Sequence, residues 1–430
     1  MPMKEKVNVL TLGCSKNTVD SERLMKQIEA NNFTLTADPE DADTVIINTC
    51  GFIEDAKQES INTILNAVEL KKAGRLKRVI VSGCLSERYK DTLIKEIPDV
   101  DVYFGTEKYE GIINELGGEL KSNLLGERII TTPGHTAYLK ISEGCDNPCS
   151  FCSIPLIRGG HKSKSMDELV EEAKFLAKNN TKELVIIAQD TTDYGRDLYG
   201  KNSLAELLKK LSEIKGIEWI RLMYAYPSHF PDDVIEVIAK NHKICKYIDI
   251  PLQHISDKVL KSMRRGITKR RTKELLSELR RRIPGLVIRT TFIVGYPNES
   301  EEDFYELCEF VKEFKFERLG VFTYSVEENT PGFILGDPIP EKEKERRKAV
   351  LMDIQKDISA ERNAKLIDSK TEVLIERVED EFYIGRTYAD APEVDCEVLV
   401  KTENGKIEIG SFAEVIINDC DEYDLYACIS

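Results

Sequence analysis

Long apolar runs are what this 430-residue sequence lacks most clearly. No stretch approaches the roughly 18 consecutive apolar residues that a membrane-spanning helix needs. The strongly apolar segments, such as residues 185–188, have the length of a strand. The first residues, MPMKEK, lack the anatomy of a secretory signal. We therefore expect a cytoplasmic protein with no membrane partner.

Basic charge is also in short supply, because 61 Lys and Arg face 76 Asp and Glu and leave a net charge of −15. This balance argues against a nucleic-acid-binding protein of the ordinary basic kind. Most of the acidity lies at the end of the chain, where residues 367–430 hold 17 acidic and 5 basic residues, a net of −12. With 41% hydrophobic residues, the chain can still build buried cores.

Strands alternate with helices in the first part of the chain, residues 1–130. This alternation is typical of a parallel α/β sheet. The expected strands are 7–13, 44–49 and 79–82, and the expected helices are 21–31, 56–72 and 88–96.

The same alternation repeats about six times through residues 131–366. The expected strands are 138–142, 183–188, 219–224, 247–251, 286–294 and 319–324, and the expected helices are 165–179, 204–215, 231–240, 272–282 and 300–314. Because six units fall short of a complete eight-unit barrel, we expect a partial, open (β/α)6 barrel. A connecting helix over 341–365 should follow it.

Short strands punctuated by Gly, Asn and Asp fill the last part of the chain. They are expected at 372–378, 382–387, 397–400, 406–409, 413–417 and 425–429. This pattern predicts a small all-β barrel. The predicted fold class is therefore α/β with an appended β-barrel, and the predicted domains are 1–130, 131–366 and 367–430.

Three of the eleven cysteines form a tight group in the segment CDNPCSFC. Cys145, Cys149 and Cys152 can reach three corners of one iron–sulfur cubane and leave the fourth iron open. They follow the strand at 138–142, which puts them at the carboxyl-terminal mouth of the barrel, where such folds place their chemistry. A zinc site completed by a residue such as His161, or three reduced structural thiols, is the alternative.

Three further cysteines each follow a predicted strand of the first domain. Cys14, Cys50 and Cys84 end the segments LTLGC, IINTC and IVSGC. Because the carboxyl ends of parallel strands line up along one edge of a sheet, these thiols should converge into a metal site. Buried cysteines acting as small hydrophobic residues are the alternative. The same alternative is preferred for the other cysteines, Cys245, Cys308, Cys396, Cys420 and Cys428, which show no mutual spacing.

These motifs together resemble the methylthiotransferase branch of the radical S-adenosylmethionine (SAM) enzymes, over nearly the whole chain. CDNPCSFC, with Phe151 before its last cysteine, looks like the family's radical-SAM triplet, and residues 289–300 (RTTFIVGYPNES) look like its SAM-proximal segment. Residues 1–130 look like the family's methylthiotransferase domain and residues 367–430 like its TRAM domain. The resemblance implies SAM and two [4Fe–4S] clusters, one on each group of three cysteines.

By the same resemblance, one SAM would methylate a sulfur held at the auxiliary cluster on Cys14, Cys50 and Cys84. A second SAM would yield the 5′-deoxyadenosyl radical that activates the substrate carbon. The reaction needs a reductant and a sulfur donor as partners. The candidate contacts to SAM are Phe151, Gln189, Arg221, Gln253 and Val294.

Two features favour a protein substrate over transfer RNA. The segment AQDTTDYG, residues 188–195, looks like that of the family members that modify a ribosomal protein, so Asp190, Thr191, Thr192 and Tyr194 are expected to face the substrate. An acidic TRAM barrel would repel RNA phosphates and attract a basic protein. The implied substrate is an aspartate β-carbon in the basic ribosomal protein S-twelve, free or in the small subunit.

Alternatives to this substrate remain. Methylthiolation of a tRNA adenosine is the first alternative, and a non-catalytic iron–sulfur or zinc-binding protein is an alternative of another class. The basic stretch at 264–273 could touch ribosomal RNA or form a solvated helix face.

The two groups of cysteines are predicted to separate in function. Replacing Cys145, Cys149 and Cys152 by Ala should leave about half of the iron and abolish reductive SAM cleavage. Replacing Cys14, Cys50 and Cys84 should preserve SAM cleavage and abolish methylthio transfer. Iron analysis and chromatography of 5′-deoxyadenosine measure both effects. SAM cleavage by the first variant would contradict the assignment.

Overall fold

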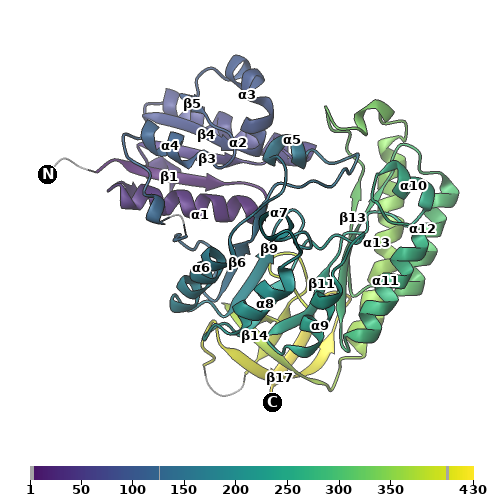
Figure 1. Cartoon of the computed structure of the whole chain (residues 1–430). Coiled ribbons are helices and arrows are strands. Elements are labelled where there is room, and N and C mark those ends of the chain that lie inside the picture. The colour runs from purple at the N-terminus through teal and green to yellow at the C-terminus, as the bar shows by residue number, and fades with distance from the viewer. Residues whose placement is uncertain (1–3, 125, 403–405) are drawn as a thin grey trace.

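A computed structural model describes residues 4–124, 126–402 and 406–430 (Figure 1). Its first part is a five-stranded parallel sheet of order β2-β1-β3-β4-β5. The strands are β1 (Lys6–Thr11), β2 (Thr34–Leu35), β3 (Thr44–Thr49), β4 (Arg78–Gly83) and β5 (Val102–Tyr103), and the helices are α1 (Ser15–Ala30), α2 (Glu54–Lys72), α3 (Cys84–Glu96) and α4 (Tyr109–Glu115), with 3-10 turns η1 (Pro39–Asp41) and η2 (Ser122–Leu124).

The central strand β3 is buried at all six positions because helices cover both faces of the sheet. Val45 and Ile47 pack in one core with Ile64 of α2, and Ile46 packs in another core with Leu24 of α1. The predicted parallel α/β architecture is confirmed for this part of the chain.

The middle part is a six-stranded parallel sheet of order β13-β12-β11-β10-β9-β6, which follows the order of the strands along the chain. Its strands are β6 (Thr136–Lys140), β9 (Glu183–Ile187), β10 (Trp219–Leu222), β11 (Ile244–Asp249), β12 (Val287–Val294) and β13 (Arg318–Thr323). β6 and β13 are its two edges and do not pair with each other. The sheet is therefore the open, partial barrel that the sequence predicts.

Helices cover the outer face of this sheet (Figure 1). They are α6 (Met166–Lys178), α8 (Leu204–Ser212), α9 (Asp232–Lys240), α11 (Lys269–Arg282), α12 (Glu301–Phe314) and the connecting helix α13 (Glu341–Ala364). Helix α10 (Asp257–Ser262) packs apart from them, in a cluster with Tyr296 and Tyr324. The strands alternate accordingly: Ile220 and Leu222 of β10 pack in the core under the helices, whereas Trp219 lies in a second core on the inner face. Shorter elements that were not predicted are α10, β7 (Ser142–Glu143), β8 (Lys162–Ser163), α5 (Ile154–Arg158), α7 (Arg196–Tyr199) and η3 (Phe333–Leu335).

The last part is a closed five-stranded barrel of order β14-β15-β16-β18-β17. Its strands are β14 (Lys370–Glu379), β15 (Phe382–Arg386), β16 (Val398–Lys401), β17 (Phe412–Cys420) and β18 (Leu425–Ile429). The predicted strand at 406–409 is wrong. Ile407 packs against the barrel core, but Ile409 is 53% exposed and begins a turn. One inward side chain does not suffice to add a strand to a barrel that five strands already close.

Buried charges join this closed barrel to the inner face of the open one. Glu183 of β9 is fully buried and pairs with Arg386 of β15 (Nη2–Oε2, 2.7 Å) and with Arg221 of β10 (Nε–Oε1, 2.7 Å). Trp219 and Phe412 meet edge to face beside them, with ring centroids 4.9 Å apart. Figure 1 shows the closed barrel and the first sheet at opposite ends of the middle sheet.

Two further expectations concern the whole chain. No helix among the described residues is both long enough and apolar enough to cross a membrane. The domain boundaries at 130/131 and 366/367 stay a prediction.

Glu183 is predicted to hold the two barrels together. The change Glu183→Ala leaves two guanidinium groups buried without their shared carboxylate, which should lower the free energy of unfolding by about 3 kcal/mol. Trp219 is the single tryptophan of the chain and lies in this interface, so its fluorescence during urea unfolding reports the change directly. Glu414→Ala is the control, because Glu414 and Lys370 form an ion pair (3.2 Å) with both side chains more than 60% exposed, worth at most about 1 kcal/mol. Equal effects of the two changes would contradict the prediction.

Candidate active site

The segment CDNPCSFC forms a tight loop behind the short strand β7. Gly144 enters the loop at φ +71°, and a Cβ on it would lie 2.1 Å from the carbonyl oxygen of Gly160, so only glycine fits. The N–H of Cys145 donates to the carbonyl of Gly159 (3.1 Å), and the N–H of Ser150 donates to that of Met263 (3.0 Å). Backbone hydrogen bonds therefore fix the loop at the mouth of the open barrel.

Polar groups from the loop itself and from outside it surround the sulfur atoms of its cysteines. Nη1 of Arg265 lies 3.3 Å from Sγ of Cys149, and Nδ2 of Asn147 lies 3.4 Å from Sγ of Cys145. Arg265 also lies over the ring of Tyr226, whose hydroxyl is 3.7 Å from Sγ of Cys149. Such donors stabilise thiolates and tune the potential of a bound cluster. Sequence reasoning missed Arg265 as a site residue, although it lies in the basic stretch at 264–273.

Burial keeps the thiols of Cys145 and Cys152 protonated when no metal is bound. It raises the pKa of Cys145 to about 11 and that of Cys152 to about 12. A metal must displace these protons, because the thiolate is the ligand.

The three cysteines of the first sheet lie at one edge of it, as expected. Cys14 directly precedes α1, Cys50 follows β3, and Cys84 opens α3 directly after β4. Gly13, at φ +89°, packs so closely on Cys50 that a Cβ there would lie 2.9 Å from the cysteine sulfur. Burial raises the pKa of Cys84 to about 12, because it outweighs the lowering effect of the nearby Arg158 guanidinium.

Arg158 of α5 connects the two groups of cysteines. Its Nη2 donates to Oδ1 of Asn17 (2.6 Å) and lies 3.5 Å from Sγ of Cys84. Its Nη1 pairs with Asp20 of α1 (3.0 Å) and with Glu143, which lies two residues before Cys145 (2.9 Å). Sequence reasoning missed this residue, because the contact depends on how the first sheet docks.

Lys140 completes a buried cluster of charges around Arg158. Its Nζ contacts Asp20, Glu143 (2.6 Å) and Glu107 (3.0 Å). Burial by itself would raise the pKa of Glu143, but Lys140 and Arg158 outweigh it and hold the pKa well below its usual range. The ammonium group occupies the place between the three carboxylates that a cation would take, so this cluster is a structural network. It holds the edge of the first sheet that carries Cys84 next to the loop that carries Cys145.

A cavity of about 200 Å³ opens beside the cysteine loop and is lined in part by Cys145, Asp190, Thr192 and Tyr226. Asp190 accepts hydrogen bonds from Asn147 (2.7 Å) and from the hydroxyl of Thr192 (2.6 Å). The structure thus places two of the four expected substrate-facing residues at the cavity.

The other two expected substrate-facing residues point elsewhere. Tyr194 is fully buried in the core under the outer helices, and its hydroxyl donates to the carbonyl of Lys164 (3.0 Å). The hydroxyl of Thr191 donates to the carbonyl of Met223 (2.8 Å). The structure therefore does not support the expectation for these two residues, because strand β9 ends before them and the chain turns their side chains inward.

Two of the expected SAM contacts offer groups that need a partner. Gln189 donates to Glu143 (2.8 Å), and its buried Oε1 has no partner among the described residues. Oε1 of Gln253 is also buried without a partner among the described residues, and the backbone of Gln253 is held at φ +71°. A buried acceptor without a donor is costly, so both fit a polar ligand. Phe151 is half-buried and packs against the cluster that contains Tyr296 and Tyr324.

The remaining two expected SAM contacts are committed to other roles. Arg221 is fully buried and bonds to Glu183 and to the carbonyl of Tyr388 (2.7 Å), so it joins the two barrels instead of reaching the mouth. Val294 is fully buried in the core under the helices. Neither side chain reaches the mouth, so the structure does not support the expected contacts of these two residues with SAM.

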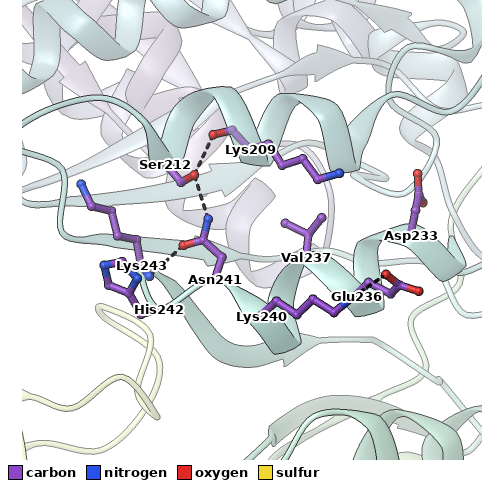
Figure 2. Close-up of a pocket in the computed structure, with 9 residues that line it drawn as sticks. All are labelled: Lys209, Ser212, Asp233, Glu236, Val237, Lys240, Asn241, His242 and Lys243. Carbon is purple, nitrogen blue, oxygen red and sulfur yellow. Dashed lines mark hydrogen bonds and ion pairs between the residues drawn. The ribbon is translucent and has the colours of Figure 1, made fainter.

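A separate hollow of about 510 Å³ lies on the outer side of the open barrel, between α8 and α9 (Figure 2). Two of its cationic side chains have partners close by. Lys240 pairs with Glu236 (3.1 Å), and Nζ of Lys243 donates to the carbonyl of Ile217 (2.7 Å). None of its lining residues is a cysteine, so we place the candidate active site at the mouth.

Three family models match successive parts of the chain. Residues 6–105 match "Uncharacterized protein family UPF0004", residues 139–311 match the radical SAM superfamily, and residues 367–429 match the TRAM domain. Similar curated proteins cover the whole chain. The chain is 54% identical to "Ribosomal protein uS12 methylthiotransferase RimO" of Chloroherpeton thalassium, over 99% of both chains. It is 49% identical to the protein of that name from Bacteroides thetaiotaomicron, over 99% of this chain and 98% of the other.

Solved structures share the fold at low identity. The radical S-adenosylmethionine methyltransferase TsrM from Kitasatospora setae, with tryptophan substrate and a SAM analog bound, superposes with a TM-score of 0.58 and 12% identity, over 88% of this chain and 79% of that one. OxsB, a cobalamin-dependent S-adenosylmethionine radical enzyme, gives a TM-score of 0.52 and 12% identity, over 81% and 56%.

Thiol reactivity should distinguish the site cysteines from the others. Because burial holds the pKa of Cys84 and Cys152 near 12, their thiolate fraction, and hence their rate of alkylation, should rise about tenfold from pH 8 to pH 9. Reconstitution with iron and sulfide should then block alkylation of the six site cysteines. Cys428 of the closed barrel is the control and should stay reactive. Peptide mass spectrometry measures each site, and a site cysteine that stays reactive after reconstitution would contradict the assignment.

Proposed function

This chain belongs to the family of ribosomal protein uS12 methylthiotransferases, and we propose that it transfers a methylthio group to the β-carbon of an aspartate in that ribosomal protein. The observation that carries the proposal is the arrangement at the mouth, where Arg158 contacts Cys84 of one group and pairs with Glu143, two residues before Cys145 of the other group. We also propose the division into domains at 130/131 and 366/367, and we place the reaction in the cytoplasm.

Membership of the radical SAM superfamily implies a [4Fe–4S] cluster and SAM. In our proposal Cys145, Cys149 and Cys152 hold this cluster, and Cys14, Cys50 and Cys84 hold a second one. Three thiols per group suit an iron–sulfur cluster with one open iron. When bound, these groups supply hydrogen-atom abstraction from carbon and transfer of methyl and sulfur, for which side chains have no equivalent.

The residues of the chain bind and orient these groups. Arg265 and Asn147 donate toward sulfur atoms of the first cluster, and the free acceptors of Gln189 and Gln253 would bind polar hydrogens of SAM. Asp190 and Thr192 line the cavity through which a loop of the substrate would enter. Arg158 fixes the edge that carries the second group, so that both groups serve one substrate carbon. An external reductant and an external sulfur donor complete the reaction.

Charge favours a basic protein as the substrate. The closed barrel carries a net charge of −12 over residues 367–430, and Glu379, Asp380 and Glu381 lie exposed at the turn between β14 and β15. This field attracts a basic protein such as one of the ribosome and repels the phosphates of RNA. A tRNA substrate is therefore the weaker candidate.

Binding of uS12 to the full chain should weaken as salt rises, because screening shortens the reach of the field to about 8 Å at physiological ionic strength. Changing Glu379, Asp380 and Glu381 to Lys should weaken binding several-fold more, while SAM cleavage without substrate stays unchanged. The control carries Asp233→Lys, Glu278→Lys and Glu309→Lys on the outer helices, which changes the net charge equally. Fluorescence anisotropy with labelled uS12 across a salt series measures both.

Two results would contradict the substrate assignment. One is an affinity for uS12 that does not depend on salt or on the β14–β15 turn. The other is tighter binding of tRNA than of uS12, which would favour the alternative reaction on a tRNA adenosine.

A further inference from the structure

A second hollow of about 420 Å³ lies at the surface beside α10, on the outer side of the cysteine loop. Ser150, Lys258, Lys261, Arg264, Asn298 and Leu335 contribute to its lining. The reaction described above assigns no role to it. It differs from the cavity at the mouth, because the two share no lining residue.

The cysteine loop contributes Ser150 to one side of this hollow. Ser150 follows Cys149 directly, and its hydroxyl donates to the carbonyl of Ser262 (2.9 Å) at the end of α10. Arg264 is followed by Arg265, whose guanidinium lies 3.3 Å from Sγ of Cys149. A molecule bound in the hollow would therefore contact two residues that are close to Cys149. Ser150 is its neighbour in the chain, and Arg264 is the neighbour of Arg265, which contacts its sulfur atom.

The charge of the hollow is opposite to that of the chain. Its lining includes three cationic side chains and no carboxylate, although the chain has a net charge of −15. Lys258 pairs with Asp303 (2.7 Å). Lys261 and Arg264 are exposed and form no ion pair with the described residues. Two cations are thus left for an external partner, and that partner must be acidic.

An apolar tip stands beside these cations. In the 3-10 turn η3, Phe333 is 47%, Ile334 87% and Leu335 45% exposed. The N–H of Gly332, just before the turn, donates to the carbonyl of Ser150 (2.6 Å), which attaches the tip to the cysteine loop. Apolar anchors next to charged groups are typical of a protein interface. RNA is bound mainly through its phosphates, and an exposed isoleucine does not bind phosphate.

We propose that the tip Phe333–Leu335 and the cations Lys261 and Arg264 form the docking surface for an acidic electron-carrier protein. The proposal rests on the function above, which needs one external electron at the cluster on Cys145, Cys149 and Cys152. In the step, the reduced carrier loses one electron and the cluster gains it, so no bond changes at this surface. The substrate uS12 is excluded as the occupant, because a basic protein would be repelled here. A small surface suffices, since electron-transfer encounters have small interfaces.

The test compares two reductants on reconstituted full-length protein. The variants are Lys261→Glu with Arg264→Glu, and Ile334→Asp. The control is Lys209→Glu with Lys240→Glu in the outer hollow (Figure 2), which changes the net charge as much as the first variant. Stopped-flow absorbance records reduction of the cluster by reduced flavodoxin, used as an acidic probe, and by dithionite, which is small and needs no docking.

We expect each variant to slow reduction by flavodoxin at least tenfold and to leave reduction by dithionite unchanged. The control should match the wild type, whose rate with flavodoxin should fall as salt rises. Unchanged rates with flavodoxin would overturn the proposal, as would equal loss with both reductants. Loss of affinity for a 16S ribosomal RNA fragment, with flavodoxin rates unchanged, would assign the surface to RNA and likewise overturn it. If the wild type with dithionite does not cleave SAM, the proposed function itself fails, which is a separate outcome.

Discussion

The buried charge cluster of Asp20, Lys140, Glu143 and Arg158 is the interaction on which the rest of the structure depends. Asp20 belongs to α1 in the first part of the chain, and the other three residues belong to the middle part. Removing one partner of a buried ion pair leaves an uncompensated charge, which costs several kcal/mol, about 3–5. Separating the first sheet from the mouth of the open barrel therefore costs free energy. The two groups of cysteines stay together because this cluster holds the surfaces that carry them.

The open barrel explains why two further units pack on it. Six strands leave β6 and β13 unpaired with each other and leave the inner face to be covered. The closed barrel covers this face through Glu183, Arg221 and Arg386, whereas the first sheet docks at the carboxyl ends of the strands. A cavity of about 200 Å³ remains beside the cysteine loop, and the acidic barrel lies at the other end of the sheet (Figure 1).

Much of this architecture could be predicted from the sequence, because strand and helix periodicity are local signals. The convergence of Cys14, Cys50 and Cys84 followed from one rule, that parallel strands end at the same edge. Side-chain direction was harder to predict. Arg221 was expected at SAM, but its side of β10 faces the closed barrel, and the docking of that barrel leaves no trace in local sequence. Tyr194 was misplaced for a similar reason, since the chain turns after β9. The contact between Arg158 and Cys84 joins residues 74 positions apart and exists only once the two units have docked.

The most direct test of the account is mass spectrometry of uS12 from cells with and without this protein. The account predicts that an aspartate-containing peptide of uS12 carries one CH3S group in place of one hydrogen when the protein is present. The peptide should be unmodified when the gene is deleted, and the modification should return with the wild-type gene but not with a gene lacking either group of cysteines. An identical modified peptide in the deletion strain would contradict the account.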